Sequence, residues 1–232
     1  MAVVSAEIVA PYPDRQLEGI LTISTDFGAS SSADGKQSHD DVMISRTIEK
    51  SIRRSNAIDT ESLCIVAGEK VWSVRADIHL LDDDGGLIDA SCIAVIAGLA
   101  HFRRPDLHVE GSRVHVFSVY ERVPVPLAIL HWPMSVSFSF FGKDALTVVD
   151  ANKEEQGLRS GYAIISVNRH KEVCQITKAG GVPVNAASFM RCVSIAYEKA
   201  TKLSRELSLA LEKDQKIGIT AHHNETDAQN ER

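Results

Sequence analysis

The feature that most limits the fold is a strict alternation of apolar and polar residues in the stretch 71–81. Successive side chains of a strand point to opposite sides, so each set lies on one face. The apolar set is Trp72, Val74, Ala76, Ile78 and Leu80, and the polar set is Ser73, Arg75, Asp77 and His79. The pattern predicts a strand with one face in the core.

Other segments predict a fold of strands followed by helices. Residues 2–10 and 17–27 read as strands joined by a turn, 42–54 as a helix, and 88–102 as a buried helix, because that apolar run is too long for a strand. Residues 134–149 and 162–177 have an antiparallel strand pattern, and 189–211 has the apolar spacing of a long helix.

The order of strands and then a helix occurs twice, with each helix expected to cover its own sheet, which predicts the α+β class. We expect a first subdomain at residues 1–126, a second at 127–212, and a polar flexible tail at 213–232.

Composition limits the functions that this chain can have. The 232 residues carry a net charge of −6, so any contact with nucleic acid has to be local. The four cysteines stand singly in apolar stretches, which indicates reduced thiols of a cytosolic or nuclear protein. The longest apolar run, residues 92–100, is too short to cross a bilayer, so we expect no membrane partner.

A local basic cluster lies on the predicted helix 42–54. Arg46, Lys50 and Arg53 fall on one helix face by their spacing of four and three residues. Such a stripe can follow a phosphate backbone. It can equally be a solvated face with Glu49 as an ionic partner, and spacing alone favours that interpretation.

Two acidic features allow more than one interpretation. The Asp82-Asp83-Asp84 turn has hard oxygen ligands for a divalent cation, but the spacing of a calcium loop would need carboxylates where Leu80 and Ser91 stand. A turn and helix-entry role is favoured, so we expect no metal. On the polar strand face, Asp77 and His79 could form an acid–base pair, although such faces are more often exposed to solvent or part of an interface.

Five blocks of sequence carry a more specific signal. They are residues 58–64 (Ile-Asp-Thr-Glu-Ser-Leu-Cys), 66–72, 84–90 (Asp-Gly-Gly-Leu-Ile-Asp-Ala), 101–106 and 123–127. Together they resemble the RNase PH-like ring subunits of the eukaryotic RNA exosome, most of all the component-nine, or polymyositis/scleroderma autoantigen, type. The resemblance runs from about Val3 to Lys216, and the family's additional N-terminal segment has no counterpart ahead of Ala2.

The resemblance implies an RNase PH-like fold, also described as ribosomal protein S5 domain 2-like. It implies a six-membered ring of paralogous subunits, with RNA-binding cap subunits, a hydrolytic nuclease and RNA as partners, and no cofactor. The ring threads RNA for 3′-5′ processing and decay, including rRNA maturation and mRNA turnover, in nucleus, nucleolus and cytoplasm.

The same resemblance implies a chain without catalysis of its own. Phosphorolytic members grip phosphate with a Thr-Arg pair where this chain has Leu87 and Ile88, and their catalytic acid aligns with Gly161. The alternative is a phosphorolytic 3′-5′ exoribonuclease that is active with a paralogous partner.

The resemblance also assigns roles to the two polar surfaces. It implies that Arg46, Lys50 and Arg53 bind RNA in the channel, because related non-catalytic subunits hold RNA with basic residues of this helix. It suggests that Arg75, Asp77 and His79 form a subunit interface.

Overall fold

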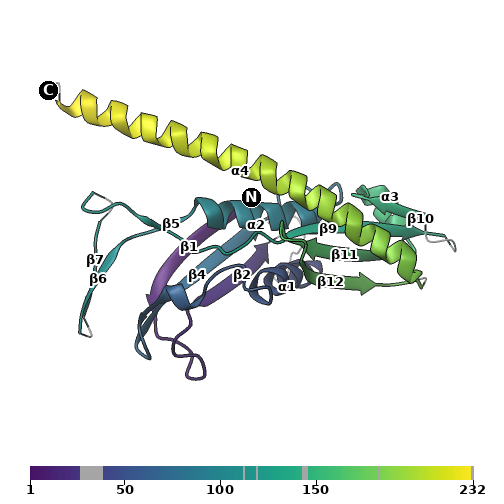
Figure 1. The fold of residues 1–232 in the computed structure, drawn as a ribbon, viewed down its shortest axis with the longest axis horizontal. Coiled ribbons are helices and arrows are strands. Elements are labelled where there is room, and N and C mark those ends of the chain that lie inside the picture. The colour runs from purple at the N-terminus through teal and green to yellow at the C-terminus, as the bar shows by residue number, and fades with distance from the viewer. Residues whose placement is uncertain (27–38, 112, 119, 143–145, 182, 231–232) are drawn as a thin grey trace, which may run out of the picture.

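The computed structural model describes residues 1–26, 39–111, 113–118, 120–142, 146–181 and 183–230. Figure 1 shows two sheets side by side, with the long helix α4 (Ala186–Asn230) crossing above them. The α+β class predicted from the sequence is confirmed, with helices packed on largely antiparallel sheets.

The first sheet has β4 (Lys70–His79) at its centre. The strands β1 (Ala2–Val9) and β2 (Ile20–Asp26) lie on either side of β4, antiparallel and parallel to it, and β3 (Cys64–Val66) also pairs with β4. The predicted core face is confirmed, because Trp72, Val74, Ala76 and Ile78 are all at most 3% exposed. The sequence predicted β1 and β2 as strands joined by a turn, and the structure adds that β4, from much later in the chain, lies between them.

The second sheet is entirely antiparallel, as the sequence predicted. Its order is β10 (Leu146–Val149), β9 (Met134–Phe141), β11 (Gly161–Val167) and β12 (Val173–Ala179). The short helix α3 (Lys153–Leu158) precedes β11 and begins with a capping box between Asn152 and Glu155.

Two small strand pairs complete the sheet structure. The strands β5 (Arg103–Arg104) and β8 (Val125–Pro126) pair with each other, and β6 (Leu107–Glu110) pairs with β7 (Arg113–Val116). In Figure 1 the hairpin of β6 and β7 extends from the body of the molecule.

Helix α2 (Leu87–His101) joins the two halves. It packs against β1 and β4 of the first sheet and also against β9 of the second. Helix α2 thus covers its own sheet, as expected, and in addition packs on the second sheet. The physical reason is that α2 is apolar over most of its surface, and such a helix is stable when buried on more than one side. One continuous core follows, from Ile78 through Val95 to Phe138.

The remaining helices cover the sheets from outside. Helix α1 (His39–Arg53) packs on β2 and β12, a short 3-10 turn spans Glu61–Leu63, and α4 packs on β9 and β11. Residues 213–230, predicted as a flexible tail, continue α4. This stretch has no proline that would end the helix, and it elongates a helix that has already nucleated. None of the described helices is both long and apolar enough to span a membrane.

Candidate nucleic-acid interface

Helix α1 separates apolar from basic side chains. Its residues Ile48 and Ile52 are fully buried against the sheet, whereas Arg46, Lys50 and Arg53 are exposed. A helix brings residues four and three apart onto one face, so the three cations share a surface as the spacing predicted. The structure therefore supplies the geometry of a basic stripe, and its RNA-binding role stays a prediction.

The stripe borders an open depression that the sequence did not reveal. Its volume is about 630 Å³, and its lining residues are Arg15, Arg46, Glu49, Lys50, Arg53 and Arg54. An adjoining hollow of about 320 Å³ shares Arg15 and Arg53 and adds Tyr12. Arg15 and Tyr12 belong to the connection between β1 and β2. No local spacing could have assigned them to this surface, because only the packing of α1 on β2 brings the two segments together.

The cations of this surface differ in how far they are neutralised. The Nη1 of Arg53 lies 3.2 Å from Oε1 of Glu49, and the Nη1 of Arg15 lies 3.5 Å from Oε2 of Glu18. Arg46 and Lys50 have no carboxylate within ion-pair distance in the described part of the chain. The solvated-face interpretation therefore applies to Arg53, while Arg46 and Lys50 keep charge for an anionic ligand.

The polar face of β4 forms a separate network. The Nε of Arg75 lies 2.8 Å from Oδ1 of Asp77, which also accepts a hydrogen bond from the Ser24 hydroxyl on β2. Burial alone would raise the pKa of Asp77, but these two hydrogen bonds and the nearby charge of Arg75 lower it below its usual value. His79 lies 3.8 Å from Asp26. Arg75, Asp77 and His79 thus interact across β2 and β4, and their interface role stays a prediction.

A smaller pocket of about 250 Å³ lies at the start of α2. Leu87, Ile88, Arg159 and Tyr162 are among its lining residues, so it includes the two apolar replacements and the residue next to Gly161. The start of α2 and the residues that flank Gly161 therefore meet in space.

The cations near this pocket are engaged in other contacts. The Nζ of Lys153 lies 3.1 Å from Oδ2 of Asp83, and the guanidinium of Arg159 lies 4.3 Å from the centre of the Tyr162 ring. Burial raises the pKa of Asp83, but the N–H of Gly85 and Lys153 outweigh it and leave that pKa low. Asp83 is thus an ionised partner that neutralises Lys153, whereas Arg159 keeps its positive charge, because stacking on Tyr162 does not neutralise it.

Gly161 stands where no larger side chain fits. A Cβ atom at this position would lie 2.9 Å from the carbonyl oxygen of Gly180, closer than such contacts normally come. Gly181, with φ of 49°, packs against the carbonyl of Ser160 in the same place. An acid at residue 161 would therefore require the end of β12 to move.

Asp89 is the carboxyl group with the largest pKa shift in this region. It accepts hydrogen bonds from the Ser137 N–H at 2.7 Å and the Ser137 hydroxyl at 2.9 Å. Burial raises its pKa to about 7, and the nearby charge of Asp150 acts in the same direction. Sequence analysis assigned Asp89 only to the motif and the first helical turn, because its burial depends on β9.

The acidic turn Asp82-Asp83-Asp84 uses its side chains locally. Oδ1 of Asp82 accepts from the N–H of Asp83, and Oδ1 of Asp83 accepts from the N–H of Gly85. Among the described residues no three His, Cys, Asp or Glu side chains gather as metal ligands would. The turn role predicted from the sequence agrees with these contacts.

Comparison with known proteins identifies the family. Residues 1–105 match the model of the 3′ exoribonuclease family, domain 1, and residues 131–199 match domain 2 of the same family. The chain belongs to this RNase PH family. The predicted RNase PH-like fold is therefore confirmed.

The relatives and solved structures agree with this family. The chain is 48% identical to the exosome complex component rrp45 of Schizosaccharomyces pombe, covering 92% of this chain and 75% of the relative. It is 43% identical to RRP45 of Homo sapiens, over 92% of this chain but only 49% of the human protein. A structure described as the Archaeoglobus fulgidus exosome with RNA bound to the active site is 26% identical, with a TM-score of 0.75, covering 88% of this chain and 77% of that one. The chain thus spans three quarters of the yeast relative and about half of the human one.

Proposed function

We propose that this chain is a non-catalytic subunit of an RNA exosome ring, of the RRP45 or component-nine type, and helps to hold RNA for 3′-5′ processing and decay. The observation that carries the proposal is the 48% identity to an exosome component across 92% of the chain. Resemblance over isolated motifs could reflect a shared fold alone, whereas this match includes both domains of the family.

The α1 surface supports the RNA-binding part of the proposal. Arg46 and Lys50 are exposed, and the open depression beside them gives a phosphate backbone access to several cations at once. Neutralisation of phosphates by such side chains releases counterions and provides affinity without base recognition. That property suits a subunit through which many different RNAs pass.

The α2 pocket supports the absence of catalysis. Phosphorolysis needs an anion-binding group and an acid that protonates the leaving oxygen. Leu87 and Ile88 provide no hydrogen-bond donor from their side chains, and residue 161 has no room for an acid. We therefore propose that this pocket does not turn over RNA.

The partners are proposed on the same basis. The chain would assemble with other RNase PH-like ring subunits, RNA-binding cap subunits and an associated hydrolytic nuclease, in the nucleus, nucleolus and cytoplasm. Arg75, Asp77 and His79 are proposed to contact a neighbouring ring subunit. Their preorganisation by Ser24 and Asp26 lowers the entropy cost of such a contact.

The test is purification of the tagged full-length protein from its own cells, followed by native mass measurement and identification of the retained proteins. Recovery of several RNase PH-like paralogues together with cap proteins and a nuclease is the expected result. Recovery of the chain alone or as a homo-oligomer would contradict the ring assignment.

The alternative is a phosphorolytic exoribonuclease that acts with a paralogous partner. The chain belongs to a 3′ exoribonuclease family, so the activity has to be measured directly. Incubation of the purified assembly with RNA and inorganic phosphate should release no nucleoside diphosphate that depends on this chain. Release that disappears when Arg159, a cation that lines the α2 pocket, is changed to alanine would favour the alternative.

A further inference from the structure

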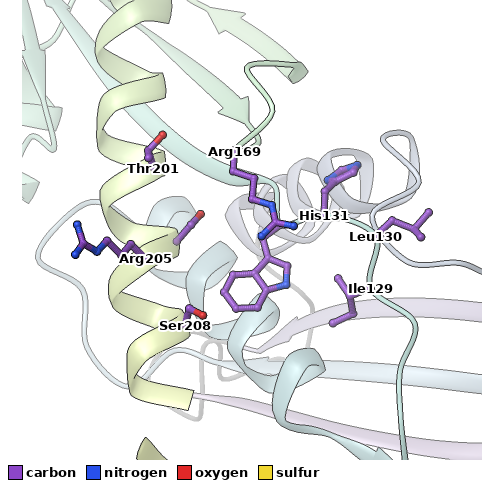
Figure 2. A pocket seen from close by; sticks show the side chains of 9 residues that line it. Ile129, Leu130, His131, Arg169, Thr201, Arg205 and Ser208 are labelled. Atoms are coloured by element: carbon purple, nitrogen blue, oxygen red, sulfur yellow. The ribbon is translucent and has the colours of Figure 1, made fainter. Parts of the chain in front are cut away.

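A hollow beside α4 lies outside the two surfaces described so far. Its volume is about 400 Å³, which is within the range of sites that hold one small ligand. One wall is α4, and the others are residues 129–132 and the turn that joins β11 to β12. In Figure 2 the side chain of Arg169 extends from this turn toward the hollow, whereas Arg205 points to the other side of α4. A ligand in the hollow would therefore meet Arg169.

The turn that carries Arg169 is held by a buried amide. Asn168 is 1% exposed, and its Oδ1 accepts hydrogen bonds from the N–H of His170 at 2.9 Å and of Glu172 at 3.0 Å. Its Nδ2 donates to the carboxylate of Glu172 at 2.7 Å. These bonds fix the backbone on both sides of Arg169, so its side chain starts from a fixed position beside the hollow.

The charge of Arg169 is available to a ligand. In the described part of the chain this residue forms no ion pair, and its guanidinium donates one hydrogen bond, of 3.4 Å from Nε to His170. None of the nine residues that line the hollow is an Asp or a Glu. Because a guanidinium has several N–H donors in one plane, its remaining donors suit the oxygens of a phosphate.

Trp132 supplies an aromatic surface in the same hollow. The residue is partly exposed, in contrast to Trp72, which is 3% exposed in the core. An aromatic ring beside a cation is a combination with which proteins bind single-stranded nucleic acids, because a base stacks on the ring while the cation pairs with the backbone. The hollow thus offers both contacts that one nucleotide uses.

The hollow begins where the α1 surface ends. Arg54 lines the depression beside α1. The next residue, Ser55, accepts a hydrogen bond of 2.7 Å at its carbonyl oxygen from Nε2 of His131, which lines the hollow. Helix α1 also packs on β12, the strand that follows the turn of Arg169. An RNA strand that continues past the end of α1 would therefore reach the hollow, and this continuity favours RNA over an acidic peptide as the occupant.

We propose that the hollow binds one nucleotide of a single-stranded RNA that also lies on α1, with its base stacked on Trp132 and its phosphate paired with Arg169. The inference rests on the proposed RNA-binding role of α1 and extends it to a second site. Arg46 and Lys50 offer contacts to phosphates alone, whereas this site also contacts a base. Stacking tolerates every base, so the site adds affinity without selecting a sequence.

The test measures binding of fluorescein-labelled octauridylate to the full-length chain at low salt, by fluorescence anisotropy. An octamer extends over about 24 Å at the phosphate spacing of a nucleic-acid strand, and α1 rises only about 10 Å from Arg46 to Arg53. The probe can therefore occupy both surfaces. Since Trp132 is the only tryptophan outside the core, unlabelled octauridylate should also quench the emission of the chain in a saturable way.

Three variants define the expected result. Trp132→Ala should weaken the affinity about tenfold, because the stacked base loses its ring, and Trp132→Phe should weaken it at most about threefold. Arg169→Glu should weaken the affinity about fivefold and make the plot of log affinity against log salt less steep by about one. Arg191→Glu is the matched control, because Arg191 is an exposed arginine of α4 that does not line the hollow, and it should leave the affinity unchanged.

Arg46→Glu separates a failure of this inference from a failure of the RNA-binding role of α1. If Arg46→Glu weakens binding but Trp132→Ala and Arg169→Glu do not, the inference is overturned and the α1 proposal stands. If none of these variants weakens binding, both are overturned. The inference also fails if uridine 5′-monophosphate binds as tightly as the octamer, which would indicate a site for free nucleotides. Quenching of Trp132 by a hexaglutamate peptide but not by octauridylate would overturn it in favour of a protein partner.

Discussion

The depression beside α1 and the pocket at the start of α2 are two concave surfaces of one fold. They differ in whether their basic side chains are engaged in contacts within the protein. At α1, Arg46 and Lys50 are exposed without an ion-pair partner among the described residues. At α2, Lys153 is paired with Asp83, and Arg159 is stacked on Tyr162. On the proposed function, the first surface would attract a phosphate backbone and the second would no longer bind a reacting phosphate.

The largest effect is expected from restoring an acid in the α2 pocket. Gly161→Asp should destabilise the protein by at least about 3 kcal/mol, because its Cβ meets the carbonyl of Gly180 and a charge becomes buried. Chemical denaturation measures this loss. Gly157→Ala is the control, since a Cβ there meets nothing within 4 Å and the residue lies in α3, so stability should stay equal or rise slightly. A fully stable Gly161→Asp protein would show that the acid position can be refilled.

The second prediction concerns the pH dependence that Asp89, in the first turn of α2, gives to the stability of the protein. Its folded-state pKa of about 7 lies above the ordinary value of 3.8, so the folded protein holds this proton more tightly than the unfolded chain. The resulting stability is complete below about pH 4 and is lost as the pH rises to about 7. Asp89→Asn keeps both contacts to Ser137 and removes the titration.

The free energies of unfolding of the two proteins should therefore diverge with pH. Between about pH 5 and about pH 8, the Asp89→Asn protein should gain on the order of 2 kcal/mol relative to the parent. Denaturation at several pH values measures the difference. Parallel curves for the two proteins would mean that the Asp89 carboxyl has an ordinary pKa in the folded protein. Its surroundings would then be more polar than the burial of the carboxyl indicates.

The smallest predicted effect is a difference in RNA affinity between variants of an unpaired and of a paired cation on the α1 surface. Arg46→Glu should weaken RNA binding by the assembled ring about fivefold, and Arg15→Glu only about twofold, because Arg15 already pairs with Glu18. Filter binding at low and physiological salt measures both. Equal effects would show that the ion pairs of Arg15 open when RNA binds, and no effect from either would remove this surface from the RNA path.

Local patterns in the sequence predicted much of the fold and part of the site. The alternation around Trp72 predicted the buried face of β4, and the spacing of Arg46, Lys50 and Arg53 predicted a shared surface. Both depend only on the geometry of one element. The resemblance aligned Leu87 and Ile88 with a phosphate-gripping pair and Gly161 with a catalytic acid, and these functional assignments stay predictions.

Contacts between distant elements were not predictable in this way. Three features depend on tertiary contacts between segments that are far apart in the sequence. They are the place of β4 between β1 and β2, the packing of α2 on both sheets, and the approach of Arg15 to α1. The helical continuation through residues 213–230 was missed for another reason. Its polar composition resembles a solvated tail, but adding residues to a helix that has already nucleated costs less than starting a new one.

The central claim is that this chain holds RNA through α1 in the assembled ring. Its most direct test is crosslinking of threaded RNA to a ring that contains Lys50→Glu with Arg53→Glu. The matched control is Arg191→Glu with Lys199→Glu, two exposed cations of α4 outside the depression. The account predicts about a tenfold loss of crosslinked RNA in the first ring and no change in the second. Unchanged crosslinking in both rings would contradict it.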